Sequence, residues 1–198
     1  YFVLRPGDRA LNLRPIPTIP APRVPHFLKA SPEGRLWGGP TFGQTLFWLD
    51  PQTGQSDNTP AVCDAGGEVY DVAFLDGVVY AAAYCGGDII RYDPRQPWDQ
   101  WGQKNPVTIA SVGRRGYIRP TGGICVGPDR RLYSGWMAEY GKYGGAVAST
   151  DPVTGVTDLW ENPLGAQALN GLAVGDGELY LGTSLDGNGL PEKTGEGP

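Results

Sequence analysis

The stretch GVVYAAAYCGGDIIRYDP, residues 77–94, decides the fold, because partial copies of it stand on both sides. In each copy a turn is followed by an aliphatic and then an aromatic residue, and the aromatics are Trp37, Tyr80, Tyr133 and Tyr180. Each of the first three copies then carries an Asp-Pro pair, at residues 50–51, 93–94 and 151–152. The spacing of roughly 40 to 50 residues is typical of repeat architectures.

One repeat unit reads as four short strands joined by turns. We expect strands over 69–74, 78–84 and 88–92, and a weaker one over 108–112. Asp76-Gly77 is a favoured hairpin turn, and the Pro of each Asp-Pro pair cannot donate to a strand ladder. The 31 glycines and 19 prolines would break any helical stripe. The sequence therefore predicts an all-β chain built from four-stranded antiparallel blades, as in a β-propeller.

The blade pattern resembles the β-propeller superfamily, in particular the NHL, SMP-30 and YVTN kind. The likeness covers about residues 31–184 and rests on the "DGxLY" and "DPxTG" elements. For the sugar lyases and lactonases among propellers, it implies a metal, or a Tyr or His base, near the mouth of the central channel. No motif in this sequence supports a divalent metal, and we predict no metal ligands.

The repeats divide the chain into a Pro-rich strap over 1–30 and blades over 31–66, 67–117, 118–167 and 168–198. The last unit stops where its second loop should be, so we expect part of a larger propeller. Its later blades would lie in a longer chain or come from another polypeptide. From Tyr1 in place of Met we expect a chain that is processed, trimmed or incompletely represented. The strap holds prolines 15, 17, 20, 22 and 25 and should be extended, as a linker or as a ligand for a proline-reading partner.

Charge and composition exclude several function classes. The formal net charge is −5 and there is no basic run, which argues against nucleic-acid binding. No apolar stretch is long enough for a membrane span. The single histidine, His26, lies in the expected strap, so we expect no Ser-His-Asp triad and no histidine on the loop face. Few lysines beside many Trp, Tyr, Gly and Pro residues favour an extracellular or periplasmic protein.

The three cysteines match no zinc motif, and their odd number leaves one without an intramolecular partner. Cys125 lies in an apolar run and is expected to be a buried thiol. Cys63 and Cys85 leave two alternatives open, a disulfide between neighbouring blades or free thiols.

The variable segments should gather on one face, which we call the loop face. In a four-stranded blade, the loop between the second and third strands and the connection to the next blade emerge there. The tight turns emerge on the opposite face, the turn face. Candidate residues at the starts of the first strands are Tyr70, Asp71, Arg119, Thr121 and Asn170, and those in the loops are Thr41, Gln44, Tyr84, Trp136, Tyr140 and Tyr143.

Aromatic rings beside amide, hydroxyl and guanidinium groups suit a carbohydrate, and an Arg suits its carboxylate. The ligand-binding candidates are Asp71, Gln44, Arg119, Thr121, Trp136 and Asn170. If the protein is a lyase or lactonase, Tyr84 or Tyr140 would be the base, with Arg119 lowering its pKa. Each aromatic has an alternative role in packing between blades, and Arg119 in an ion pair. The second function class is a noncatalytic scaffold that contacts another protein.

Overall fold

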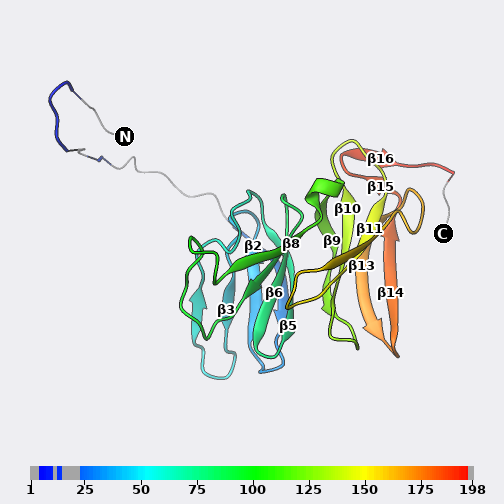
Figure 1. Cartoon of the computed structure of the whole chain (residues 1–198), viewed down its shortest axis with the longest axis horizontal. Coiled ribbons are helices and arrows are strands. Elements are labelled where there is room, and N and C mark those ends of the chain that lie inside the picture. The colour runs from blue at the N-terminus through cyan, green and yellow to red at the C-terminus, as the bar shows by residue number, and fades with distance from the viewer. Residues whose placement is uncertain (1–4, 11–12, 15–22, 196–198) are drawn as a thin grey trace.

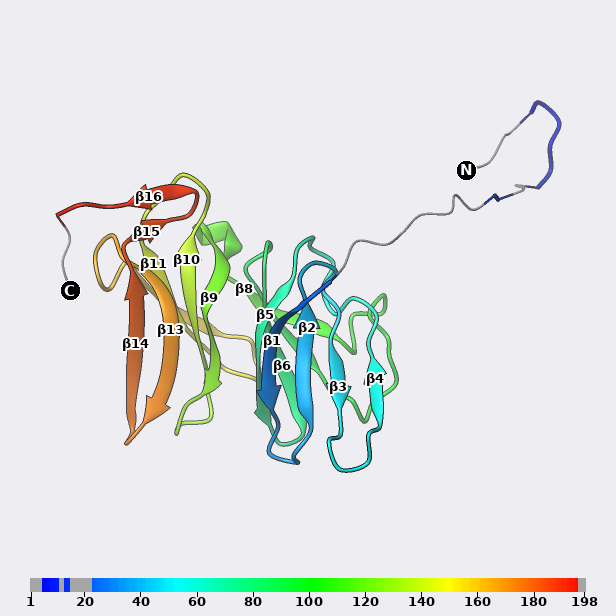
Figure 2. The ribbon, with the colours of Figure 1, turned by 180° about the vertical axis from the view of Figure 1, so that it is seen from behind.

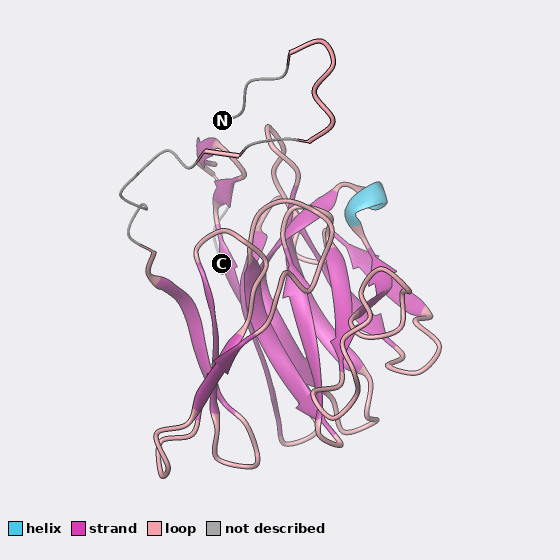
Figure 3. Ribbon diagram, turned by 90° about the vertical axis from the view of Figure 1, so that its left-hand side faces the viewer, coloured by secondary structure: helices cyan, strands magenta, loops and turns pink. Residues whose placement is uncertain are grey.

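The computed structural model describes residues 5–10, 13–14 and 23–195. Within these residues the chain is nearly all β, and the only helical segment is one 3₁₀ turn, η1 (Gly113–Arg115) (Figure 3). The predicted all-β propeller fold is confirmed.

Four antiparallel sheets follow one another along the chain (Figure 1). The first contains β1 (Pro25–Ala30), β2 (Leu36–Pro40), β3 (Phe47–Leu49) and β4 (Ser56–Asn58). The second contains β5 (Val69–Leu75), β6 (Val78–Ala83), β7 (Asp88–Tyr92) and β8 (Val107–Ser111). The third contains β9 (Tyr117–Val126), β10 (Leu132–Ala138), β11 (Gly145–Thr150) and β12 (Thr157–Glu161). The fourth has two strands, β13 (Ala168–Gly175) and β14 (Glu178–Ser184), and a small hairpin follows, β15 (Asp186–Gly187) with β16 (Leu190–Glu192).

The first sheet begins earlier than the sequence predicted. Strand β1 pairs with β2 from Pro25 to Ala30, so 25–30 belong to the first blade and not to a strap over 1–30. Pro25 is tolerated because it is the first residue of the strand, where its missing N–H costs least. The strap prolines at 15, 17, 20 and 22 lie outside the described residues.

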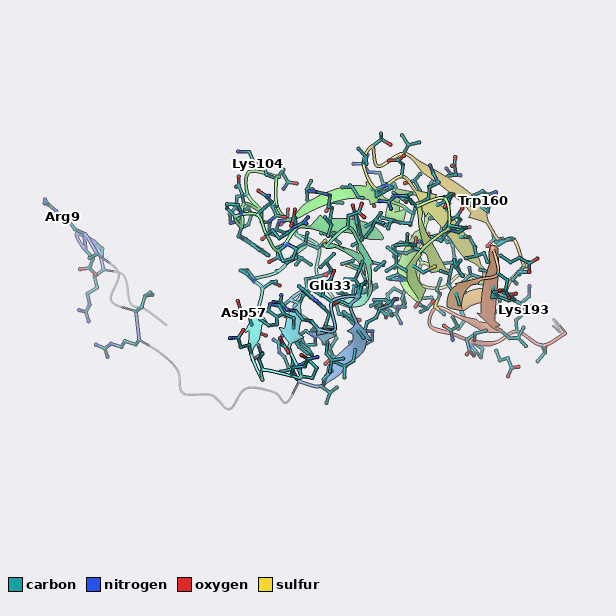
Figure 4. The ribbon with its side chains drawn as sticks, turned by 90° about the horizontal axis from the view of Figure 1, so that it is seen from below. Arg9, Glu33, Asp57, Lys104, Trp160 and Lys193 are labelled. Carbon is teal, nitrogen blue, oxygen red and sulfur yellow. The ribbon has the colours of Figure 1, made fainter. Side chains whose placement is uncertain are left out.

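The sheets are arranged radially. Their first strands β1, β5, β9 and β13 are successive neighbours, and each sheet extends outward from them. Figure 4, which looks along the strands, shows the sheets following an arc, from Asp57 in the first sheet round to Lys193 beyond the fourth. From behind, Figure 2 shows β1 and β5 adjacent, with β2, β3 and β4 following outward.

Each sheet has a leading face toward the sheet before it and a trailing face toward the sheet after it. Trp37 on the trailing face of the first sheet lies 6.2 Å, ring to ring, from Phe74 of the second. Tyr80 on the trailing face of the second belongs to the core that includes Ile124 and Leu132 of the third. Tyr133 in turn lines a cavity with Leu179 of the fourth. The repeated aromatic therefore faces the following blade in each of these sheets.

Tight turns form most of the turn face, for the expected reasons. Asp76 and Gly77 have φ of 53° and 75°, and Asp176 and Gly177 have 52° and 79°, the left-handed pair that a two-residue type I′ hairpin needs. Asp50 and Asp151 each accept two backbone N–H bonds, which hold the pKa of both carboxyls below the ordinary value.

The second sheet departs from this pattern. Its third and fourth strands are joined by a long connection rather than a tight turn. Asn105 closes the connection by donating to the carbonyls of Asp93, Gln96 and Pro97 at 2.9, 3.1 and 3.2 Å.

Candidate functional site

A β-bulge interrupts every inner strand near its loop-face end. The pairing register shifts across His26 in β1, Tyr70 in β5 and Asn170 in β13, and across 120–122 in β9. A bulge leaves a residue outside the ladder and turns its side chain away from the regular alternation. In three of the four inner strands, one residue therefore stands outside the pairing near the loop-face end, and in β9 the irregularity is longer.

Arg119 is the centre of a polar and aromatic cluster at this end of β9. Its Nη2 donates to the Tyr140 hydroxyl at 2.5 Å, and the Tyr140 hydroxyl lies 3.0 Å from that of Tyr84. The guanidinium carbon lies 4.9 Å from the Tyr84 ring centre and 5.2 Å from that of Tyr140. Two elements far apart in sequence, the loop after β6 and the loop after β10, thus hold one cation between two rings.

The guanidinium of Arg119 keeps unused hydrogen-bonding capacity. Its Nε is buried without a hydrogen-bond partner, and among the described residues Arg119 forms no ion pair with a carboxylate. The described residues therefore contain no structural ion pair of Arg119, which was the alternative role for this side chain. A buried N–H without a partner costs free energy, which a ligand acceptor would recover.

An aromatic series runs from this cluster to the first blade. The rings of Tyr84 and Tyr70 are 6.4 Å apart, and the Tyr70 ring meets the His26 imidazole edge-on at 4.5 Å. The expectation that no histidine lies on the loop face is wrong, because His26 is part of β1 and not of a strap. The only histidine of the chain therefore stands beside the candidate site.

The tyrosines favour hydrogen-bond donation over proton abstraction. Burial raises the pKa of Tyr70 to about 12. The hydrogen bond with Tyr140, and then burial, raise the pKa of Tyr84, and these outweigh the lowering effect of Arg119. Arg119 thus lowers the pKa of Tyr84 as expected, but the net pKa is raised, and at neutral pH Tyr84 is a protonated phenol. For Arg119 itself, burial would lower the pKa, but the surrounding Tyr70, Tyr84 and Tyr140 raise it.

Two of the predicted ligand-binding residues lie within the protein instead. Gln44 is 3% exposed, and its Nε2 donates to the carbonyl of Gly66 at 3.0 Å and to that of Tyr84. It braces the loop that carries Tyr84. Trp136 is fully buried in the core, and its indole N–H donates to Ser134 Oγ at 2.8 Å. Neither side chain reaches a ligand from these positions.

Asp71 and Thr121 link neighbouring inner strands. Asp71 Oδ2 accepts from Lys29 Nζ of β1 at 2.8 Å and from the N–H of Ile124 in β9 at 3.0 Å. The Thr121 hydroxyl donates to the carbonyl of Leu169 in β13. Asn170 is exposed at its bulge. Of the predicted residues, Arg119, Tyr84 and Tyr140 form one cluster, whereas Asp71 and Thr121 are occupied in holding the channel wall.

The remaining polar features do not fit a metal or a disulfide. No group of three His, Cys, Asp or Glu side chains comes together in 5–10, 13–14 or 23–195, so these residues do not fit the divalent metal that the resemblance implies. Cys63, Cys85 and Cys125 are free thiols, and Cys63 Sγ lies 3.2 Å from Asp88 Oδ2. No helix in the described part of the chain is long and apolar enough to cross a membrane.

A cavity of about 460 Å³ lies on the turn face between the first and second sheets, away from the Arg119 cluster. Its arginines are engaged: Arg95 pairs with Asp93, and Arg35 lies 4.2 Å from the centre of the Trp48 ring. We therefore place the candidate site at the loop face, where among the described residues Arg119 forms no ion pair with a carboxylate.

Comparison with known proteins supports the fold. No protein-family model and no curated protein matches the sequence. Among solved structures, the chain is similar to virginiamycin B lyase from Staphylococcus aureus, with a TM-score of 0.61 and 15% identity over 87% of this chain and 52% of the lyase. It is also similar to a luciferin-regenerating enzyme, with a TM-score of 0.56 and 15% identity over 86% of this chain and 55% of that enzyme. A chain of a nidogen/laminin complex matches with a TM-score of 0.50 and 13% identity over 70% of this chain and 47% of that one.

The chain thus spans about half the length of the solved propellers that it matches. The blades have the β-propeller fold that these solved structures share. At these identities the likeness shows the fold alone.

Proposed function

We propose that the loop face binds an acidic carbohydrate at the channel mouth, with Arg119 receiving its carboxylate. The observation that carries the proposal is the guanidinium of Arg119, which is held between the rings of Tyr84 and Tyr140 and has a buried Nε without a partner. A guanidinium presents parallel N–H groups that match a carboxylate in two bonds. A charged ligand group would therefore complete the hydrogen bonding that the protein leaves open.

The surroundings of Arg119 suit the rest of a sugar. Tyr140 is 58% exposed, Asn170 is exposed at the bulge of the adjacent strand β13, and His26 is exposed at the bulge of β1, two inner strands from β9. Sugar rings present apolar C–H faces between hydroxyls, so they bind to aromatic rings flanked by hydrogen-bonding groups. An uncharged sugar would use the same rings without the carboxylate contact. An extracellular or periplasmic location, where such polymers occur, forms part of the proposal.

Cleavage of the ligand, of the lyase or lactonase type, is the second part of the proposal. In a lyase step a base removes the proton beside the carboxylate, and the glycosidic oxygen leaves from the next carbon, so that a carbon–carbon double bond forms. An arginine on the carboxylate stabilises the charge that develops. His26 replaces Tyr84 as the proposed base, because its imidazole lies 4.5 Å, ring to ring, from Tyr70, whereas the hydrogen bond with Tyr140 and burial raise the pKa of Tyr84. The solved structures that resemble the chain include a lyase, virginiamycin B lyase, which motivates this test.

The binding proposal is tested by titrating a uronic acid and its neutral parent sugar into the protein. Arg119→Ala should weaken uronate binding by about 1.5–3 kcal/mol, roughly 10- to 150-fold, the range for a hydrogen bond to a charged group. The neutral sugar should lose less. Arg114→Ala is the matched control, since Arg114 is exposed in η1 close by in sequence and its loss removes the same charge.

If Arg119→Ala lowers the melting temperature and affects both sugars equally, the arginine is structural and the proposal is wrong. Cleavage is tested separately, by following the unsaturated product of a polyuronate in the ultraviolet. His26→Ala should abolish product formation and leave uronate binding within a few fold of the original protein.

A further inference from the structure

The hairpin of β15 and β16 contacts the loop that carries Tyr140. In Figures 1 and 2 the hairpin stands at the same end of the sheets as η1, which is the loop face. The hairpin follows β14 of the fourth sheet, whereas the loop with Tyr140 follows β10 of the third. The fourth blade therefore supports a part of the candidate site that the third blade carries.

Asn188 in this hairpin holds the loop on both sides of Tyr140. Before Tyr140 in the chain, the carbonyl of Ala138 accepts a hydrogen bond from Asn188 Nδ2 at 2.9 Å. After it, the backbone N–H of Asn188 donates to the carbonyl of Lys142 at 3.1 Å, and the carbonyl of Asn188 accepts from the N–H of Gly141 at 2.8 Å. Asn188 is 1% exposed, so these bonds are shielded from water, and losing the side chain leaves a buried carbonyl without its donor.

Two further contacts hold the hairpin close to the loop. The Tyr143 hydroxyl donates to the carbonyl of Pro191 in β16 at 3.0 Å. Gly189 has a φ of 73°, and a Cβ placed there would lie 3.4 Å from Cδ1 of Tyr140. The backbone of the hairpin thus lies directly beside the Tyr140 ring, and the position of that ring depends on the hairpin as well as on its own loop.

Tyr140 in turn contacts the guanidinium of Arg119. The Tyr140 hydroxyl accepts from Arg119 Nη2 at 2.5 Å, and the Tyr140 ring centre lies 5.2 Å from the guanidinium carbon. The loop is also tied to the end of η1, where the N–H of Glu139 donates to the carbonyl of Gly116 at 2.8 Å. Asn188 adds a second support from another blade, so it is connected to Arg119 through Tyr140.

We propose that Asn188 is a positioning residue of the ligand site. It keeps Tyr140 against Arg119 and thereby holds the guanidinium in the orientation that receives a carboxylate. Two parallel bonds to a carboxylate require one orientation of the guanidinium, which a neutral sugar does not need. Asn188 therefore governs selectivity for the acidic ligand. The inference rests on the proposed function for its ligand, but the positioning itself is a property of the free protein.

Nuclear magnetic resonance of the free protein tests the positioning without a ligand. The Nε–H signal of Arg119, identified by its loss in Arg119→Lys, reports on the adjacent rings because aromatic rings shift the resonances of nearby protons. In Asn188→Ala this signal should move toward its position in Tyr140→Ala. Asn105→Ala is the matched control, because Asn105 is 4% exposed and its amide closes a connection in the second sheet. The control loses a buried amide too, yet should leave the Arg119 signal in place.

Titrations with a uronic acid and its neutral parent sugar test the consequence for binding. Asn188→Ala should weaken uronate binding roughly 3- to 10-fold, the contribution of one hydrogen bond, and should affect the neutral sugar less. In a Tyr140→Ala background the same change should weaken binding no further, because the side chain that it positions is gone. An equal loss in both backgrounds would mean that Asn188 acts on stability alone, and the proposal would be wrong.

The positioning is also overturned if Asn188→Ala leaves the Arg119 signal in place, or if Asn105→Ala moves it as far. If Asn188→Ala does not fold, Tyr143→Phe takes its place, since it loses only the hydroxyl bond to Pro191. It should move the signal in the same direction by less, and an unmoved signal overturns the proposal. If the original protein binds no uronate, the proposed function is wrong, and the resonance result alone decides whether Asn188 positions the cluster.

Discussion

Replacing Asp71 by Ala should loosen the channel wall, because Asp71 links three inner strands. The change removes the acceptor of two hydrogen bonds, one from the N–H of Ile124 in β9 and one from Lys29 in β1. Ile124 is 1% exposed, so its N–H would lose a charged partner in a buried place, at a cost of about 1.5–3 kcal/mol. The side chains of Lys29 and Asp71 are 36% and 22% exposed, so solvent screens their pairing, which adds only about 0.2–1 kcal/mol.

The two contributions together lower the free energy of unfolding by about 2–4 kcal/mol. For a chain of this size, that corresponds to a fall in melting temperature of about 4–16 °C. Asp71→Asn should cost less, since an amide oxygen still accepts from Ile124. A double-mutant cycle with Lys29→Met should return a coupling of about 0.2–1 kcal/mol, the share that belongs to the ion pair.

Urea denaturation followed by tryptophan fluorescence measures these differences. The control is Asp57→Ala on β4, because Asp57 is exposed and the change should stay within about 0.5 kcal/mol. If Asp71→Ala costs no more than Asp57→Ala, Asp71 does not tie the strands together. If uronate binding is lost while stability is unchanged, Asp71 is a ligand residue and the reasoning above is refuted.

Three further outcomes can be measured independently. Trp136→Ala should lower the free energy of unfolding by about 3–5 kcal/mol, the usual cost of emptying a buried aromatic site, and a denaturation curve that matches the original would contradict its place in the core. The thiol of the exposed Cys85 should react quickly with Ellman's reagent at pH 8. The other two thiols should react slowly, because burial raises the pKa of Cys63 to about 12 and that of Cys125 to about 11. Fast labelling that survives Cys85→Ser would contradict this. The hydrogen bonds from Arg95 hold the pKa of Asp93 below its usual 3.8. The stability that Asp93 provides is therefore complete above about pH 4 and is lost as the pH falls further. In Asp93→Asn the melting temperature should change less with pH across that interval.

The second blade could be predicted from the sequence because its local signals agree with one another. Asp76-Gly77 sets the hairpin, the Asp-Pro pair ends the third strand, and that strand covers 88–92 as expected. The first blade was harder because its first strand contains a proline and follows a Pro-rich segment. The signal that could have found it is its position: PHFLKA precedes a turn and RLW, as YDVAFL precedes a turn and VVY.

The candidate site was predicted in part, and the errors concern where strands end. Trp136 was expected in a loop, but β10 continues to Ala138, and within that strand Trp136 points into the core. Gln44 was expected to face a ligand, but the loop turns inward at this residue, which has a φ of 55°. Arg119, Tyr84 and Tyr140 were chosen for their chemistry and do cluster. Their mutual contacts depend on how two loops fold, which no local pattern encodes.

The bulge near the loop-face end of each inner strand makes the proposed ligand site easy to alter. Because a bulged residue takes no part in the ladder, its replacement leaves the strand pairing unchanged. His26, Tyr70 and Asn170 occupy three such positions, so a library randomised at these codons would explore new ligands while keeping the scaffold constant.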